Sequence, residues 1–183
     1  MAFRINDMIT NLTGGGARPT LFQVELTSPF DNDLNTIAPF MVQSTAIPAS
    51  TVSAIEVPYF GRKIKVAGDR TFDTWNINVM NDENFKVRHY MERWHNAVNN
   101  LSQNYNTTGS PAPSNYKSTA FVKQYGKSNP DRPIRVYKFY NIFPTDISTI
   151  DLDWIATDTI ETFSVTFAYD WYEIVSGNTG TVQ

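Results

Sequence analysis

The feature that most constrains the fold is a regular alternation of apolar and polar residues near the end of the chain. Over residues 161–172, alternate positions are apolar on one side (Phe163, Val165, Phe167, Tyr169, Trp171) and small or polar on the other (Thr162, Ser164, Thr166, Ala168, Asp170). A period of two places successive side chains on opposite faces of a strand, so the pattern predicts one long β-strand with one buried face. Because such a strand is about twice the usual length, we expect it to reach beyond its own sheet. Its Ser- and Thr-rich face suits a sheet that lines a wet space.

Shorter stretches with the same period predict further strands. The clearest is 73–80, where Trp75, Ile77 and Val79 alternate with polar residues. Other predicted strands are 20–26, 40–45, 118–125, 134–143 and one with Ile150, Leu152 and Trp154 on a single face. We expect the polar stretch 27–39 to be a loop and Phe143-Pro144 to form a turn.

One stretch between these strands has helical periodicity. Asn81 or Asp82 can cap a helix, and apolar residues then recur at intervals of three and four (Val87, Tyr90, Met91, Trp94, Val98, Leu101). Many short alternating strands with one helix predict a mainly β fold, an antiparallel β-barrel or sandwich with one flanking α-helix. We expect a single domain, 1–183, with an N-terminal arm over 1–19 and a surface loop over 99–117. The arm's apolar residues need a partner surface, so we expect it to be mobile in a free subunit.

Composition places the chain among ordinary globular proteins, with 41% hydrophobic and 18% charged residues. It has no cysteine, no charged-then-apolar signal peptide and no apolar run near membrane-spanning length, which together predict a soluble cytoplasmic protein without a membrane segment. All 15 Lys and Arg residues lie at or before Lys138, and seven of the 18 acidic residues follow it. Residues 1–138 therefore carry 15 − 11 = +4 and residues 139–183 carry −7. The charge distribution alone is compatible with two interpretations: a folded surface on which both signs mix, or subunits that stack a positive face on a negative face.

No catalytic, cofactor-binding or metal-binding motif is present, so we do not expect an enzyme. The two histidines, His89 and His95, would lie roughly 120° apart around a helix axis and cannot share a metal ion as an i,i+4 pair does. Gly126-Lys127-Ser128 imitates the end of a phosphate-binding loop, but the glycine that the motif requires is replaced by Phe121. A small β-barrel enzyme or a carbohydrate-binding module is the alternative class, and no residues support either.

Several segments resemble the tail tube proteins of contractile-tailed (myovirus-type) bacteriophages and the related tubes of contractile injection systems. The most specific is 61–83, GRKIKVAGDRTFDTWNINVMNDE. Supporting segments are 18–24 (RPTLFQV), 46–48 (AIP), 116–120 (YKSTA), 143–146 (FPTD) and 160–167 (IETFSVTF). The likeness is lost at 27–39, at 99–115 and after residue 174, so contacts made there are not implied.

The resemblance implies a structural protein whose subunits join into hexameric rings, and rings that stack into a hollow tube inside a contractile sheath. It implies no catalysis and no cofactor. Implied partners are further copies of the chain, the sheath protein, the baseplate tube initiator, the tail terminator and the tape measure protein. Genomic DNA would pass through the lumen without specific binding. The protein would reside in the virion tail after assembly in the host cytoplasm.

A long hairpin that reaches the next ring would fall on 48–70. Candidate inter-subunit contacts are its charged residues and the acidic residues near the end of the chain: Arg62, Lys63, Lys65, Asp69, Arg70, Asp151, Asp153, Asp158 and Glu161. The alternative function is the tube of a bacteriocin-like, extracellular or type VI-like injection system that passes protein effectors.

Overall fold

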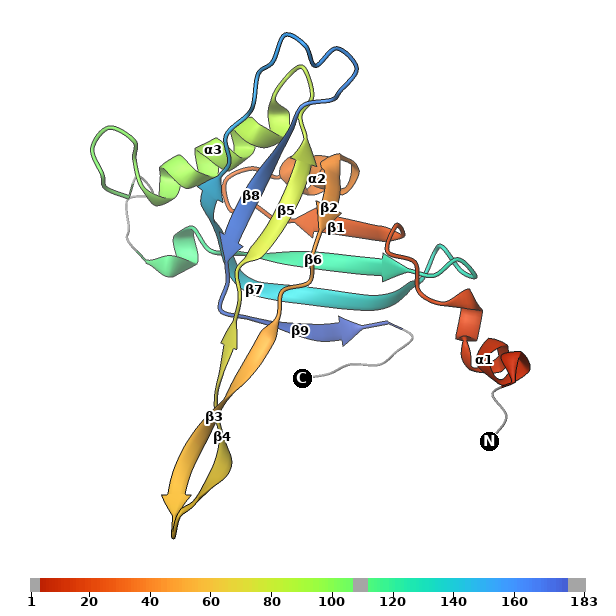
Figure 1. The fold of residues 1–183 in the computed structure, drawn as a ribbon. Coiled ribbons are helices and arrows are strands. Elements are labelled where there is room, and N and C mark those ends of the chain that lie inside the picture. Colours follow the sequence, from red (N-terminus) through yellow and green to blue (C-terminus); the bar gives the residue numbers. More distant parts are fainter. Residues whose placement is uncertain (1–3, 107–111, 178–183) are drawn as a thin grey trace.

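A computed structural model describes residues 4–106 and 112–177 and confirms a mainly antiparallel β protein (Figure 1). The main sheet has seven strands in the order β1-β6-β7-β8-β5-β2, and β9 also pairs with β7. The bounds are β1 Phe22–Leu26, β2 Val42–Thr45, β5 Trp75–Met80, β6 Ser118–Tyr125, β7 Pro133–Ile147, β8 Thr162–Ala168 and β9 Trp171–Ser176. The strands predicted at 20–26, 73–80, 118–125 and 134–143 are therefore confirmed, with small shifts at their ends.

The sheet has two halves, and strand β7 contributes one part of its length to each. Its first part pairs with β6 and β9, and its last residues pair with β8. Between these parts Asn141 has a φ of 58°. Asparagine tolerates this left-handed conformation better than most residues do. Asn141 lies at the point where β7 passes from one half of the sheet to the other.

The core fills the space between the two halves and two helices. Helix α3, Lys86–Val98, buries Val87, Met91 and Trp94, which share one stripe of the predicted amphipathic helix. Trp75 on β5 stacks against Phe139 on β7 with ring centroids 4.6 Å apart, so the two halves meet through a fully buried aromatic pair. The predicted cap is also partly correct, since the Asp82 carboxylate accepts a hydrogen bond from the Lys86 backbone N–H at 2.9 Å.

The prediction of one long strand over 161–172 is wrong. The chain leaves β8 after Ala168, turns at Tyr169 and Asp170, and continues as β9 in the other half of the sheet. The alternation of apolar and polar residues does not reveal this break, because the apolar position at the turn is still filled by a residue on the core. Tyr169 packs against the ring of Phe139, with 5.2 Å between ring centroids. Trp171 lies outside the core at 44% exposure and stacks on Tyr140.

The segment 27–45 also differs from its prediction. Residues predicted as loop include helix α2, Leu34–Met41, and the predicted strand 40–45 begins only at Val42. Leu34 and Ala38 are buried one helical turn apart and hold α2 on the core, whereas Phe40 is exposed. Pro39 lies in the last turn of this helix, and tertiary burial outweighs the local cost of that proline.

Three further predictions fail in the second half of the chain. Phe143-Pro144 forms no turn, because Pro144 lies inside β7 beside a register shift, where a strand tolerates proline. The face of Ile150, Leu152 and Trp154 belongs to no strand, since residues 148–161 form an irregular loop. Leu101, predicted on the helix, lies beyond its end and is exposed. Part of the predicted loop 99–117 lies outside the described residues, and a short 3-10 helix, Pro113–Asn115, follows that part.

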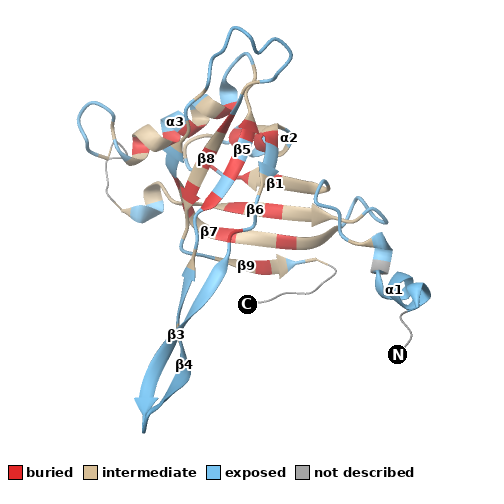
Figure 2. Ribbon diagram, viewed as in Figure 1, coloured by how far each residue is buried: buried red, intermediate tan, exposed pale blue. Residues whose placement is uncertain are grey.

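Two projections extend from this body. One is the hairpin of β3, Ser50–Tyr59, and β4, Arg62–Phe72, which forms a separate two-stranded sheet. The other is the N-terminal segment with helix α1, Ile5–Asn11, and the 3-10 turn Thr13–Gly15. Figure 2 shows that the described residues of both are mostly exposed, while the buried residues gather in the body.

Candidate interaction surfaces

The hairpin of β3 and β4 ends in a tight turn that presents an aromatic residue. Tyr59 pairs with Arg62, which leaves Phe60 and Gly61 as the turn residues, and both have positive φ. Such a turn matches the twist of the two strands but is unusual for phenylalanine. Phe60 is 91% exposed at the tip.

The register gives the hairpin two chemically different faces. Ile55 pairs with Val66 and Val57 pairs with Ile64, so these four residues form one apolar face. Each of the four is about half exposed, between 46% and 54%. The opposite face carries Glu56 across from Lys65, next to Lys63. An apolar face that its own subunit leaves uncovered indicates contact with another molecule.

The base of the hairpin is fixed to the body. Phe72 packs against Tyr169 and Tyr172, with centroids 6.0 Å and 5.5 Å away. The Tyr172 hydroxyl donates to the Pro48 carbonyl at 3.3 Å, and the Asp73 N–H donates to the Ala49 carbonyl at 3.2 Å. The hairpin is therefore held where it leaves the sheet and is free of the body further out.

The basic residues predicted as contacts do not form one cluster. Lys63 and Lys65 lie on the polar face, and Lys63 is paired with Glu56 at 2.7 Å. Arg62, opposite Tyr59, lies on the apolar face. Asp69 and Arg70 lie exposed near the base, beyond a register shift in the strand pair. A Cβ at Gly68 would lie 2.3 Å from the Ser53 hydroxyl oxygen, so a larger residue at this shift would force the Ser53 side chain to move.

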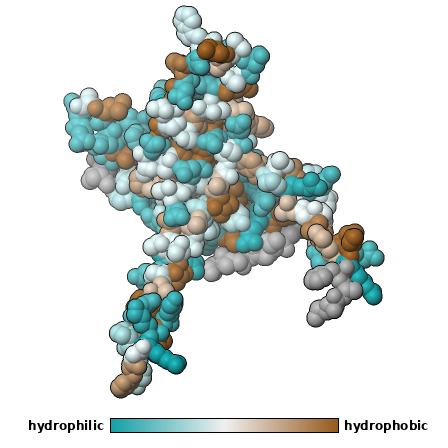
Figure 3. Space-filling view, viewed as in Figure 1, coloured by the Kyte–Doolittle hydropathy of each residue, from teal (hydrophilic) through white to brown (hydrophobic). Residues whose placement is uncertain are grey.

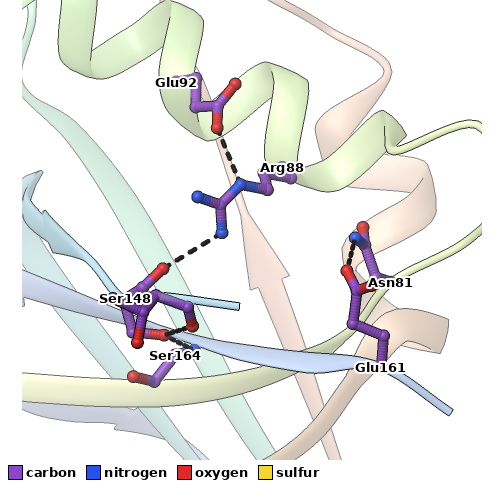
Figure 4. A network of polar contacts seen from close by, with 7 residues as sticks. Asn81, Arg88, Glu92, Ser148, Glu161 and Ser164 are labelled. Atoms are coloured by element: carbon purple, nitrogen blue, oxygen red, sulfur yellow. Dashed lines mark hydrogen bonds and ion pairs between the residues drawn. The ribbon is translucent and has the colours of Figure 1, made fainter. Parts of the chain in front are cut away.

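The acidic residues predicted as contacts lie on the loop 148–161. Asp151, Asp153 and Asp158 are exposed. Glu161 differs, because it is half-buried and accepts a hydrogen bond from the Asn81 amide at 2.6 Å (Figure 4). The loop also exposes Trp154 fully and Leu152 by more than four-fifths, two residues that the sequence predicted to be on a strand. Their neighbour Ile155 is exposed to the same degree as Leu152.

Both ends of this loop are tied to the body (Figure 4). Arg88 of α3 donates to the Ser148 carbonyl at 3.2 Å and pairs with Glu92 at 2.8 Å. The Ser148 hydroxyl accepts the Ser164 N–H at 2.8 Å. The loop is therefore positioned at its ends while its middle carries uncovered apolar and acidic side chains.

The hairpin and the loop 148–161 lie at opposite ends of the molecule (Figure 1). Over 48–72 the hairpin carries four basic residues and two acidic ones, whereas the loop carries four acidic residues and no basic one. One subunit therefore presents complementary charge, and uncovered apolar side chains, at its two ends.

The N-terminal segment adds a third uncovered apolar surface. Ile5, Met8, Ile9 and Leu12 recur at the spacing of one helical face, and each is at least half exposed. Figure 3 shows hydrophobic surface on this projection and on the hairpin. Met1 and Phe3 of the predicted arm lie outside the described residues.

The histidine and glycine motifs of the sequence form no metal or phosphate site in the described part of the chain. No group of three His, Cys, Asp or Glu side chains there could hold a metal ion. His89 and His95 both lie on α3, and Gly126-Lys127-Ser128 lies in the connection between β6 and β7, where no helix follows. Across residues 4–106 and 112–177, no helix is both long and apolar enough for a membrane span.

These features define a mainly β protein with uncovered apolar and charged projections, and the described residues contain no group of side chains that could hold a metal ion. A profile for the family described as phage tail tube protein matches residues 9–175, so the chain belongs to that family. It is 37% identical over 161 residues to the tail tube protein gp19 of Enterobacteria phage T4, covering 88% of this chain and 93% of that one. The predicted recognition of a tail tube protein, its fold and its non-enzymatic nature are thereby confirmed.

Solved structures agree on the fold. A chain of the anti-feeding prophage baseplate, a six-fold symmetrised structure, matches with a TM-score of 0.61, 12% identity, and coverage of 87% of this chain and 95% of that one. A chain of the sheath–tube complex of the extracellular contractile injection system PVC in its extended state matches with a TM-score of 0.57, 14% identity, and coverage of 96% and 99%.

Proposed function

We propose that this tail tube protein forms hexameric rings that stack into the hollow inner tube of a contractile phage tail, the conduit for DNA ejection. The observation that supports this most is a subunit with uncovered apolar and oppositely charged surfaces at its two ends. Such a contact is heterologous, and repetition of a heterologous contact that does not close produces a filament. The 37% identity to a phage T4 tail tube protein favours a phage tail over other assemblies.

The hairpin and the loop 148–161 are the proposed ring-to-ring contacts. In this arrangement Arg62, Lys63, Lys65 and Arg70 of one ring approach Asp151, Asp153 and Asp158 of the next. The apolar face of the hairpin is covered at the same time, so charge sets the orientation and apolar burial supplies most of the free energy.

Edge strands supply the proposed lateral contacts. Strand β2 ends one side of the sheet order and β1 ends the other, and each is paired on one side only in the described subunit. Unpaired strand edges form hydrogen bonds with a neighbouring chain readily. Six subunits joined in this way would close a ring.

The remaining partners follow from such a tube. A sheath protein would cover its outside, a baseplate tube initiator would start it, a tail terminator would end it and a tape measure protein would set its length. Assembly would take place in the host cytoplasm.

A second candidate is the tube of an injection system that passes protein effectors. The fold matches to the anti-feeding prophage and PVC chains favour it, although at 12% and 14% identity they concern the fold alone. Cargo separates the two candidates, because particles isolated from the source cell would contain either DNA or protein.

Electron microscopy of the purified protein tests the proposal. We expect rings with six-fold symmetry at low concentration and tubes at high concentration or after addition of baseplates. A chain that stays monomeric in light scattering at high concentration and gives no polymer with baseplates would overturn the proposed function.

A further inference from the structure

The loop 99–105, which follows α3, is held in shape by hydrogen bonds within itself. The Asn100 N–H donates to the Tyr105 carbonyl at 2.9 Å, and the Asn104 N–H donates to the Asn100 carbonyl at 3.0 Å. The side-chain oxygen of Asn100 accepts hydrogen bonds from the backbone N–H and the hydroxyl of Ser102, at 2.9 Å and 2.8 Å. Asparagine and serine side chains commonly fix loops in this way.

This loop presents apolar side chains to solvent. Leu101 is 88% exposed and Tyr105 is 53% exposed. The Leu101 N–H donates to the Asn96 side-chain oxygen at 3.1 Å, which fixes the backbone of the exposed leucine to α3. A side chain held in place before binding loses little freedom on binding, so Leu101 is prepared for a contact. The resemblance to tail tube proteins is lost over 99–115, so the family resemblance does not imply this contact.

A hollow of about 180 Å³ lies between the start of β1 and the end of β2. Most of its lining is apolar (Pro19, Phe22, Ile47, Val122 and Tyr137), and none of its described lining residues is charged. An apolar cavity of about 150 Å³ can hold a benzene molecule. The hollow is therefore large enough for one leucine side chain.

The loop 99–105 and the hollow lie on opposite sides of the molecule. Figure 1 shows the loop beyond the left end of α3, whereas β1 starts on the right. The loop therefore does not fill the hollow of its own subunit. The direction from loop to hollow also runs across the direction from the hairpin to the loop 148–161, which are the proposed ring-to-ring contacts.

The two surfaces match in charge as well as in apolar character. The loop 99–105 has no charged residue, like the described lining of the hollow, whereas the hairpin and the loop 148–161 are both charged. The buried centre of a protein interface is typically depleted of charge. The hollow also adjoins β1 and β2, the strands that end the sheet order, so this contact would lie beside the proposed edge contact.

A contact between two different patches of the same chain is heterologous, and it closes a ring when the rotation between subunits allows. On the basis of the proposed tube, we infer that the loop 99–105 of one subunit docks into the hollow between β1 and β2 of its neighbour in the same ring. Leu101 is the side chain that enters the hollow.

A charge at Leu101 tests whether this residue holds the ring together. Leu101→Asp should fold normally, because the side chain is exposed, and should need about tenfold more protein to form rings. Gln103→Asp is the matched control, since it adds the same charge at another exposed position of the loop and should form rings like the unmodified chain. Circular dichroism checks the fold and sedimentation measures the rings. Equal ring formation by Leu101→Asp and the unmodified chain would overturn the inference.

Paired cysteines test where Leu101 binds, because the chain has no cysteine. The double variant Leu101→Cys with Ile47→Cys, oxidised after assembly, should give a ladder on a denaturing gel that stops at six chains. Each single variant should remain largely monomeric on the gel.

The outcomes separate this inference from the proposed function. Rings of the double variant that form no cross-link would overturn the inference and leave the proposed function standing. A ladder that continues beyond six chains would place the contact between rings and also overturn it. If the double variant forms no rings, the result with Leu101→Asp decides. If the unmodified chain forms no rings under any condition, the proposed function fails and the inference fails with it.

Discussion

Tyr169 is one of a few residues with a buried polar atom that makes no hydrogen bond in the described part of the chain. Its ring packs between Phe72 and Phe139, and its hydroxyl is buried without a hydrogen-bond partner among the described residues. Burial raises the pKa of Tyr169 well above its ordinary value, and the nearby Tyr172 and Asp73 raise it further. The residue is therefore kept neutral at the turn between β8 and β9.

The Tyr169→Phe variant removes this unsatisfied group. Because no hydrogen bond is lost, we expect stability at neutral pH to be unchanged or higher by about 1 kcal/mol. A raised pKa in the folded state stabilises the fold below the unfolded pKa of about 10 and loses that contribution as pH rises above it. The unmodified chain should therefore lose stability above about pH 10 more steeply than the variant. Urea titrations at neutral and alkaline pH measure both effects, and equal alkaline slopes would contradict the prediction.

At the scale of elements, the hairpin combines charge and apolar surface on separate faces. We expect the triple variant Arg62→Glu, Lys63→Glu and Lys65→Glu to fold normally, since exposed substitutions shift stability by about 0.5 kcal/mol each. Tube formation should fail, because both faces would then present negative charge to the acidic loop. Circular dichroism checks the fold and sedimentation measures polymer.

A control variant that reverses the charge of Arg18, Lys127 and Arg132, exposed residues away from the hairpin, should still polymerise. Unchanged polymer yield in the hairpin variant would show that its cations face solvent.

The apolar face gives a second, separable prediction. Val57→Ser with Ile64→Ser removes apolar surface that the free subunit leaves about half exposed, so we expect little change in subunit stability. The concentration needed for polymerisation should rise, and raising the salt concentration should change this defect little, because the lost contact is apolar. By contrast, polymerisation of the unmodified chain should weaken with salt as its charge contacts are screened. A variant that polymerises like the unmodified chain would exclude this face from the contact.

At the scale of the whole molecule, we propose that the N-terminal segment becomes covered when subunits assemble. Its apolar residues are exposed and are not among those packed against the core, so we expect them to contact a surface on another molecule. We expect backbone amides of residues 5–12 to exchange rapidly with deuterium in free subunits and slowly in tubes. Exchange at Ile77, in strand β5, which is paired on both sides, is the internal control and should be slow in both states. Equal strong protection of residues 5–12 in free subunits would contradict the prediction.

The sequence predicted correctly the strands and the helix whose apolar residues follow a regular period. Strand β5 and helix α3 were recognised because each buries one face against the core along its whole length. The break at Tyr169 was missed because an aromatic residue stays in the apolar register while the chain changes sheets. The sequence did not predict helix α2, because two buried residues and a proline do not make a recognisable helical period. The two faces of the hairpin depend on cross-strand register, which the sequence does not show, so the placement of Arg62 and Lys63 on opposite faces could not be predicted.

The sheet order has a consequence for how this chain folds. Strand β8 lies between β5 and β7, so the part of the sheet made from residues 42–80 joins the part made from residues 118–147 only after residues 162–168 are in place. On a ribosome β8 is made after both strands that it joins. Closing contacts between such distant segments is slow because a long loop must first lose its freedom. Until then both parts present open strand edges, so a chaperone that holds incomplete chains apart would protect this protein from polymerising before it is folded.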